Sequence, residues 1–196
     1  GNVTEGNIIV NATDKGTVRL ILNNASISNT TTAPIKVLDA KKVILTLADN
    51  TTNTITDSSR LSTEEDYSAA IYSKEDLIIN GNGTLNVNAG YRNGIKSTDD
   101  CIIVSGTLNI TSTEDGIIGK DLCGVVAGDI NINAGSDGIK STYDTDTTKG
   151  NVIIEGGNIT IKASNDGIQA ENILVINDGT INIKTNNGAA DTTQTH

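Results

Sequence analysis

The chain has 196 residues and a formal net charge of −10, and it contains one Pro, four Tyr and no Phe, Trp or Met. Its apolar residues are therefore almost entirely Ile, Val, Leu and Ala, which favours a core built from many β-strands. The acidic balance argues against nucleic acid or an anionic lipid surface as a partner. No run of about 18 apolar residues occurs, so we expect no membrane insertion.

The N-terminal part, residues 1–70, contains alternating segments without a strict repeat. The segments "VRLILNNASISN", "APIKV", "KKVILTL" and "NTITD" alternate apolar and polar residues, as strands do. The stretch "DSSRLSTEEDYSAA" at 57–70 is predicted to be a polar loop. We therefore expect less regular coils here than in the remainder of the chain.

Residues 71–190 repeat with a period of about 22 residues. A glycine-led strand recurs as "GTLNVNA" at 83–89, "GTLNITS" at 106–112, "GDININA" at 128–134, "GNITIKA" at 157–163 and "GTINIKT" at 179–185. An apolar strand such as "LIIN" precedes each copy, and a short "GIK" element adds a third strand. One longer step is explained by a loop inserted at 143–149.

Three short strands per period, without helical periodicity, describe one coil of a parallel β-helix. The fold class predicted is all-β: a single-stranded right-handed parallel β-helix of about seven coils, forming one domain over residues 1–196. We expect a monomer.

Period-two alternation indicates which side chains point inward. Leu85 and Val87 of the first regular coil should stack with their copies about 4.8 Å away, and Asn86 should begin an outer polar row. Cys101 and Cys123 lie one period apart, so we predict stacked free thiols rather than a disulfide.

A first acidic column follows from the motif in which an acid or its amide precedes Gly-Ile. Its members are Asn93, Asp115, Asp137, Asp166 and Asn187. Stacked carboxylates repel one another unless a cation cancels their charge, and oxygen ligands without Cys or His suit Ca²⁺. We therefore predict Ca²⁺ as a cofactor, with Asp115, Asp137 and Asp166 as ligands and Glu114 as a further one.

A second acidic column lies after the third strand of each coil, too far along the chain to share an ion with the first column. It contains Glu75, Asp76, Asp99, Asp100, Asp121, Asp144 and Glu171. Two readings remain open. These acids bond local backbone amides in turns, or Asp99, Asp121 and Asp144 add metal ligands.

Between the columns, one row of outward side chains is predicted to face the solvent. It contains Lys36, Tyr72, Lys96, Ile118, Lys140 and Gln169. The lysines either form exposed salt bridges or bind a polymer laid along the helix axis. The candidate substrate-binding residues are Lys96, Lys140, Gln169, Tyr72, Tyr91 and Tyr143.

Four segments of the sequence resemble the carbohydrate-binding β-helix domains of cellulose-degrading clostridia, which are related to the family 9 polysaccharide lyases. These segments are "TAPIKVLDAKKVILTLADNTTNTITD", "AAIYSKEDLIINGNGTLNVNAG", "DGIIGKD" and "SNDGIQA". The resemblance covers nearly the whole chain. It implies a secreted or surface-attached bacterial protein that binds calcium and plant cell-wall polysaccharide, notably polygalacturonate and cellulose. In the related lyases, aspartates before glycine hold calcium and a lysine is the base. This places Asp115, Asp137 and Asp166 as ligands and Lys96 or Lys140 in the base-like position, with Asn93 as a departure.

Three functions therefore compete: a non-catalytic polysaccharide-binding module, a calcium-dependent pectate lyase acting by β-elimination, and a structural surface protein or adhesin. We expect the first, with no catalytic residue and with acidic polysaccharide preferred to cellulose. Flat cellulose sites generally use rows of exposed aromatic rings, and this chain has four tyrosines.

Overall fold

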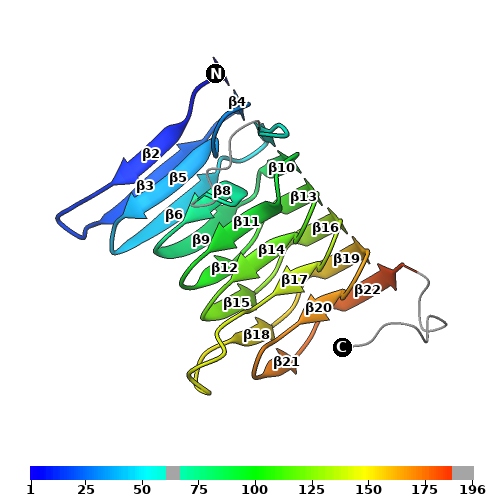
Figure 1. Cartoon of the computed structure of the whole chain (residues 1–196). Coiled ribbons are helices and arrows are strands. Elements are labelled where there is room, and N and C mark those ends of the chain that lie inside the picture. Colours follow the sequence, from blue (N-terminus) through cyan, green and yellow to red (C-terminus); the bar gives the residue numbers. More distant parts are fainter. Residues whose placement is uncertain (61–66, 187–196) are drawn as a thin grey trace.

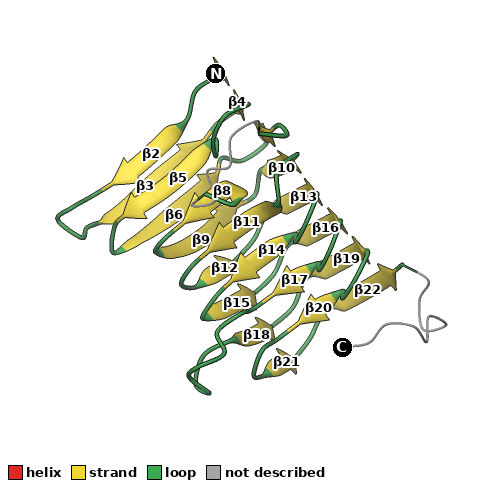
Figure 2. Ribbon diagram, viewed as in Figure 1, coloured by secondary structure: helices red, strands yellow, loops and turns green. Residues whose placement is uncertain are grey.

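The computed structural model describes residues 1–60 and 67–186, and these residues form strands, turns and loops without a helix (Figure 2). It follows that no helix in these two ranges is long and apolar enough to cross a membrane.

The strands form three parallel sheets, each with one strand from every coil. Sheet A contains β1 (Asn2–Thr4), β4 (Ser26–Asn29), β7 (Thr52–Asp57), β10 (Thr84–Ala89), β13 (Thr107–Ser112), β16 (Asp129–Ala134), β19 (Asn158–Ala163) and β22 (Thr180–Thr185). Sheet B contains β2 (Ile8–Asn11), β5 (Ile35–Asp39), β8 (Ala69–Ser73), β11 (Asn93–Ser97), β14 (Ile117–Gly119), β17 (Ile139–Lys140) and β20 (Ile168–Gln169). Sheet C contains β3 (Thr17–Leu22), β6 (Lys42–Leu47), β9 (Asp76–Gly81), β12 (Cys101–Ile103), β15 (Leu122–Val125), β18 (Asn151–Ile154) and β21 (Leu174–Ile176).

The chain passes through sheets B, C and A in turn, and Figure 1 shows the successive coils stacked in sequence order. From β2 to β22 this path makes seven coils of three strands. The predicted parallel β-helix is thereby confirmed in its class, in the number of its coils and in the number of strands per coil. The loop that contains residues 143–149 connects β17 to β18, at the turn from sheet B to sheet C.

The core is a column of aliphatic layers, as the alternation predicted. Leu85 pairs in register with Leu108, which pairs with Ile130, and all three side chains are buried. Their outward neighbours remain at least partly exposed. Each coil therefore buries its apolar strand face against the same face of the next coil.

The two cysteines are free thiols, buried, and paired in register on β12 and β15, as predicted. Burial raises the pKa of the Cys123 thiol to about 12. Both thiols are therefore protonated at neutral pH and unreactive.

Glycine is required at two kinds of turn, for two different reasons. A Cβ added at Gly116 would lie 2.5 Å from the carbonyl oxygen of Gly138, so the glycine after each acid allows close coil stacking. Its φ is not positive, so this glycine is needed for space rather than for a left-handed backbone. Positive φ occurs instead at the turn into sheet A, for example +117° at Gly128 and +118° at Gly179.

Candidate functional site

The first acidic column forms a hydrogen-bonded ladder between coils. Asn93 Oδ1 accepts the Asp115 amide at 3.0 Å, and Asp115 Oδ1 accepts the Asp137 amide at 3.0 Å. Asp137 Oδ1 in turn accepts the Asp166 amide at 2.9 Å. The recurrence of Asp or Asn before glycine thus has a structural cause, because each side chain satisfies a backbone donor on the next coil.

Asp137 is the most constrained member of this column. Its side chain is 0% exposed and its second oxygen pairs with Lys140 Nζ at 2.6 Å. The Asn165 side chain also donates to Asp137 Oδ1, at 2.8 Å. The charge that the stacking was expected to leave uncompensated is therefore balanced by amides and by a lysine. Calcium binding at this column stays a prediction.

The other residues of this prediction are placed as follows. Glu114 is exposed, and its Oε1 lies 3.9 Å from Arg92 Nε, too far for a hydrogen bond. Asn187 lies outside the described residues.

Replacement of Asp137 by alanine should lower the free energy of unfolding by about 2 kcal/mol, because it leaves three partly buried donors without their acceptor. Urea denaturation measures the effect, with the exposed Asp144→Ala as a control. Unchanged stability would contradict a structural role for the ladder, whereas a parallel loss of calcium affinity would support a metal site there.

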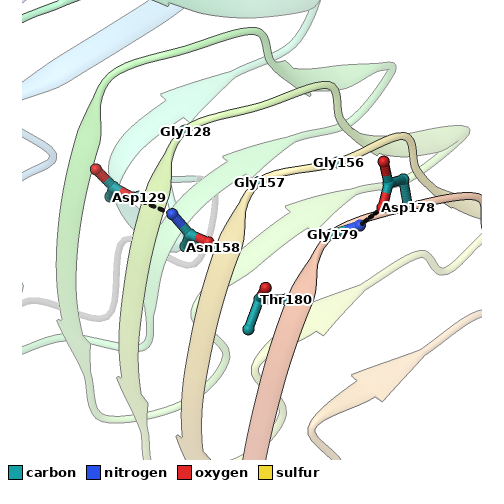
Figure 3. Close-up of a pocket in the computed structure, with 8 residues that line it drawn as sticks. All are labelled: Gly128, Asp129, Gly156, Gly157, Asn158, Asp178, Gly179 and Thr180. Atoms are coloured by element: carbon teal, nitrogen blue, oxygen red, sulfur yellow. Dashed lines mark hydrogen bonds between the residues drawn. The ribbon is translucent and has the colours of Figure 1, made fainter.

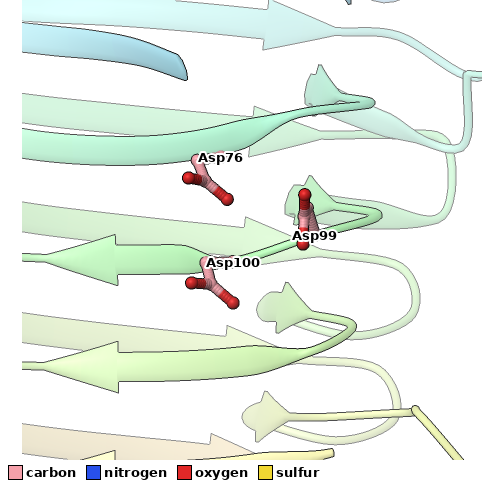
Figure 4. A group of neighbouring side chains, drawn as sticks. All are labelled: Asp76, Asp99 and Asp100. Atoms are coloured by element: carbon pink, nitrogen blue, oxygen red, sulfur yellow. The ribbon is translucent and has the colours of Figure 1, made fainter. Parts of the chain in front are cut away.

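The second acidic column brings carboxylates together without such a ladder. Oxygens of Asp76, Asp99 and Asp100 lie within 4.8 Å of one another (Figure 4). Asp76 begins β9, and Asp99 and Asp100 form the turn that enters β12, so neighbouring coils supply the group. Among the residues described here, this is the one acidic group close enough to share an ion. We call it the acidic cluster.

The electrostatics of the acidic cluster show mutual repulsion. Burial, a side-chain hydrogen bond with Asp121 and the charges of Asp76, Asp121 and Asp100 raise the pKa of Asp99 to about 6. Burial and the charges of Asp76 and Asp121 also raise the pKa of Asp100, although Lys149 and Lys42 oppose the shift. A cation at this point would relieve the repulsion.

Asp121, also predicted as a ligand, borders the acidic cluster on the next coil. Its side chain is 10% exposed and pairs with Lys149, which comes from the loop between β17 and β18. Asp144 lies exposed in the same loop and is not part of the cluster. The sequence thus identified Asp99 and Asp121, but Asp76 and Asp100 were noticed only as members of a column.

The predicted lysine row is a register column on the outer face of sheet B. Pairing aligns Lys36 with Tyr72, Tyr72 with Lys96, Lys96 with Ile118, Ile118 with Lys140, and Lys140 with Gln169. Tyr72 and Ile118 are only 7% and 3% exposed, so the face is less open than the alternation suggests. Lys36 is also buried, at 9% exposed, so Lys96, Lys140 and Gln169 are the partly exposed polar side chains of the row.

The lysines of this row differ in their surroundings. Burial lowers the pKa of Lys96, and Arg92 and Lys120 lower it further against the effect of Asp115 and Glu114. Lys96 Nζ donates to Ser68 Oγ at 3.2 Å and has no carboxylate partner among the described ion pairs. Burial is the largest single influence on Lys140 and acts to lower its pKa, but the hydrogen bond to Asp137 and the charges of Asp115, Asp137 and Asp166 together outweigh it, so the pKa is raised.

Two of the predicted tyrosines flank the ends of strands of sheet B, and cations lie beside their rings. The Tyr91 ring lies 4.5 Å from Arg60 Cζ and 5.6 Å from Arg92 Cζ. The Tyr143 ring lies 4.8 Å from Lys120 Nζ and 5.0 Å from Lys149 Nζ. Their faces are therefore already in contact with cations.

A shallow groove, which the sequence did not indicate, runs along the turn from sheet C to sheet A (Figure 3). It is lined by Gly128, Asp129, Gly156, Gly157, Asn158, Asp178, Gly179 and Thr180. Stacked glycines make the groove, because no side chain projects from them, and Asn158 donates to Asp129 Oδ1 at 2.8 Å across neighbouring coils.

The fold is that of a parallel β-helix that carries an acidic cluster and a lysine row on adjoining surfaces. The chain belongs to the family described as carbohydrate-binding domain-containing protein, whose model matches residues 1–196. A relative with that description from Acetivibrio thermocellus is 36% identical over 114 residues, which is 56% of this chain and 40% of the relative. The chain thus spans less than half the length of that relative.

A solved structure supports the same class. The polysaccharide lyase-like protein from C. thermocellum, solved as a gadolinium derivative, superposes with a TM-score of 0.83 at 31% sequence identity. The match covers 96% of this chain and 83% of the solved chain. The resemblance drawn from the sequence is therefore confirmed.

Proposed function

We propose that the chain is a non-catalytic module that binds acidic plant cell-wall polysaccharide through Ca²⁺ held by the acidic cluster. The observation that carries this proposal is the convergence of Asp76, Asp99 and Asp100. Carboxylates alone supply the hard oxygen ligands that Ca²⁺ prefers. The residues therefore fit the ion, and the raised pKa values of Asp99 and Asp100 are those of partly buried acids beside other carboxylates.

Charge explains why an ion is needed for this partner. A protein of net charge −10 repels a polyuronate, and a shared divalent cation turns that repulsion into attraction. Lys96 and Lys140, on the adjoining sheet, would pair with further uronate carboxylates, with Gln169, Tyr91 and Tyr143 bordering the same surface. The similar C. thermocellum protein is a gadolinium derivative, and Gd³⁺ is likewise a hard cation that takes oxygen ligands. The proposal places the protein outside the bacterial cell, secreted or attached to the surface.

A second candidate, calcium-dependent β-elimination, is favoured by one observation. Lys96 has a lowered pKa on a lyase-like fold, and a lysine that gives up its proton readily serves as a general base. This activity predicts an unsaturated product, which absorbs in the ultraviolet, and Lys96→Ala should abolish that absorbance.

The test is retention in an affinity gel that contains polygalacturonate, with calcium or with EDTA, on samples also assayed for unsaturated product. We expect retention with calcium, none with EDTA, and no product. Retention that is unchanged by EDTA would contradict the proposed calcium bridge. Formation of an unsaturated product that depends on Lys96 would show that the chain is a lyase and not a non-catalytic binding module.

Calcium affinity should fall as the pH is lowered through 6. Asp99 must lose its proton to bind the ion, and its pKa of about 6 lies above the ordinary value of 3.8, so a tenth of the carboxyl is ionised one pH unit lower. We expect calorimetry to show an affinity about tenfold weaker at pH 5 than the ionised site would have. A flat profile between pH 5 and 7 would exclude Asp99 as a ligand.

The effect of pH on the folding stability of the calcium-free protein is opposite in sign to its effect on calcium affinity. A raised pKa gives stability that is complete below pH 3.8 and is lost as the pH rises through about 6, so the calcium-free protein should lose stability over this interval.

A further inference from the structure

The outward face of sheet A, from β7 to β22, consists mainly of uncharged polar side chains. Every outward side chain of these strands is Thr or Asn, except Asp129, Lys162 and Lys184. The three charged side chains lie on β16, β19 and β22, so the outward face of β7, β10 and β13 carries no charge. It also has no aromatic or aliphatic side chain, in contrast to sheets B and C.

The middle column of this face is ordered by its own hydrogen bonds. It consists, in register, of Thr54, Asn86, Asn109, Asn131, Thr160 and Asn182. Asn109 Nδ2 donates to Asn86 Oδ1 at 2.9 Å, and Asn131 Nδ2 donates to Asn109 Oδ1 at 3.1 Å. The ladder fixes the orientation of the amides, so the donors and acceptors that it does not use are held toward the solvent.

The glycine-lined groove borders the same face. Asp129, Asn158 and Thr180, which line it, are also the first outward residues of β16, β19 and β22 (Figure 3). The groove therefore runs along the helix axis, across three coils, parallel to the polar columns. A polymer lying in this direction would meet the same set of groups about every 4.8 Å.

We propose that this face and its bordering groove bind an uncharged polysaccharide whose chain lies along the helix axis. Sugar hydroxyls both donate and accept hydrogen bonds, as threonine hydroxyls and asparagine amides do. A repeating polymer matches a repeating protein surface, so many weak contacts add along one chain. The uncharged coils β7, β10 and β13 offer no counter-charge to a polyuronate.

This inference goes beyond the proposed function, because it assigns a second binding surface, on another face of the molecule, that needs no calcium. The alternative is that the Thr and Asn columns serve only to stabilise the coils. The two are separated by changing exposed side chains that lie outside the asparagine ladder.

The experiment is affinity electrophoresis of the whole chain in gels that contain hydroxyethylcellulose, with EDTA present. The test variant is Thr111→Glu/Thr160→Glu, which places charge on the face two coils apart. The matched control is Thr145→Glu/Thr147→Glu, in the exposed loop between β17 and β18. A third variant, Thr111→Val/Thr160→Val, removes the hydroxyls without adding charge, and thermal melts verify folding.

We expect retention of the wild type and of the loop control, with affinity at least about tenfold weaker for the glutamate variant of the face. The valine variant should be weakened in the same direction. Equal retention of the folded face variant and the control would overturn the proposal, as would a wild type that is not retained. Polygalacturonate gels with calcium, run on the same samples, test the acidic cluster separately, so failure of one proposal is distinguishable from failure of the other.

Discussion

Replacement of Arg60 by alanine should lower the free energy of unfolding by about 3–5 kcal/mol, because it leaves the carboxylate of Asp57 buried without its cation. Both side chains of this pair are fully buried, and Arg60 Nη2 lies 2.6 Å from Asp57 Oδ2. Arg60 Nε donates to Asp57 Oδ1 at 3.1 Å, and Nη2 donates to the carbonyl of Ala69 at 3.0 Å. A fourth bond, from Arg60 Nη1, reaches the carbonyl of Tyr67, so one guanidinium ties the segment after β7 to the strand β8.

Chemical denaturation of Arg60→Ala measures this effect, and Arg19→Ala, at an exposed position of β3, is the matched control. Arg60→Lys should recover only part of the loss, since an ammonium cannot reproduce the bidentate contact. Burial already raises the pKa of Asp57 against the effect of Arg60. A raised pKa favours the folded state at low pH, so the loss in Arg60→Ala should shrink as the pH falls. An equal loss at pH 4 and pH 7 would show that packing against Tyr91, rather than the ion pair, is responsible.

The sequence predicted the coils because each repeat carries the same alternation. Leu85, Leu108 and Ile130 occupy equivalent apolar positions in successive repeats. Because these positions stack in register, each copy supports the assignment of the others to the interior. The polar segment at 57–70 was harder to predict, because its sequence shows no repeat. Asp57 nevertheless continues the inward series of Asn53 and Ile55, and a carboxylate at an inward position requires a buried partner. That signal was present in the sequence, and the buried partner is Arg60, three residues further along the chain.

The acidic columns show the limit of the same reasoning. Spacing assigned Asp115 and Asp137 to one column and Asp99 and Asp121 to another, and both columns exist. It could not show that backbone amides of the next coil occupy oxygens of the first column. Nor could it show that consecutive acids at one turn, Asp99 and Asp100, converge on Asp76 of the preceding coil. These differences arise from turn geometry, which the repeat length does not determine.

The double variant Asp99→Asn/Asp100→Asn should bind calcium on the order of a hundredfold more weakly, because the affinity of oxygen sites depends on how many of their ligands are charged. Retention on polygalacturonate in the presence of calcium should be lost with it. Without calcium the effect should have the opposite sign. The raised pKa values of both acids arise from burial and from repulsion by neighbouring acids in the folded state, so their neutral replacements should stabilise the calcium-free protein at pH 7.

The matched control is Asp115→Asn/Asp166→Asn, which removes two charges from the first acidic column and keeps the side-chain oxygen that accepts the Asp137 amide. Calorimetry with CaCl₂ and thermal melts with and without EDTA compare the two variants. Calcium raises the melting temperature only where the folded state binds it, so the variant that loses this increase identifies the column that holds the ion. Loss in the control, with the acidic cluster variant unaffected, would move the calcium site to the Asp-Gly motif and reduce the acidic cluster to a group of turn residues.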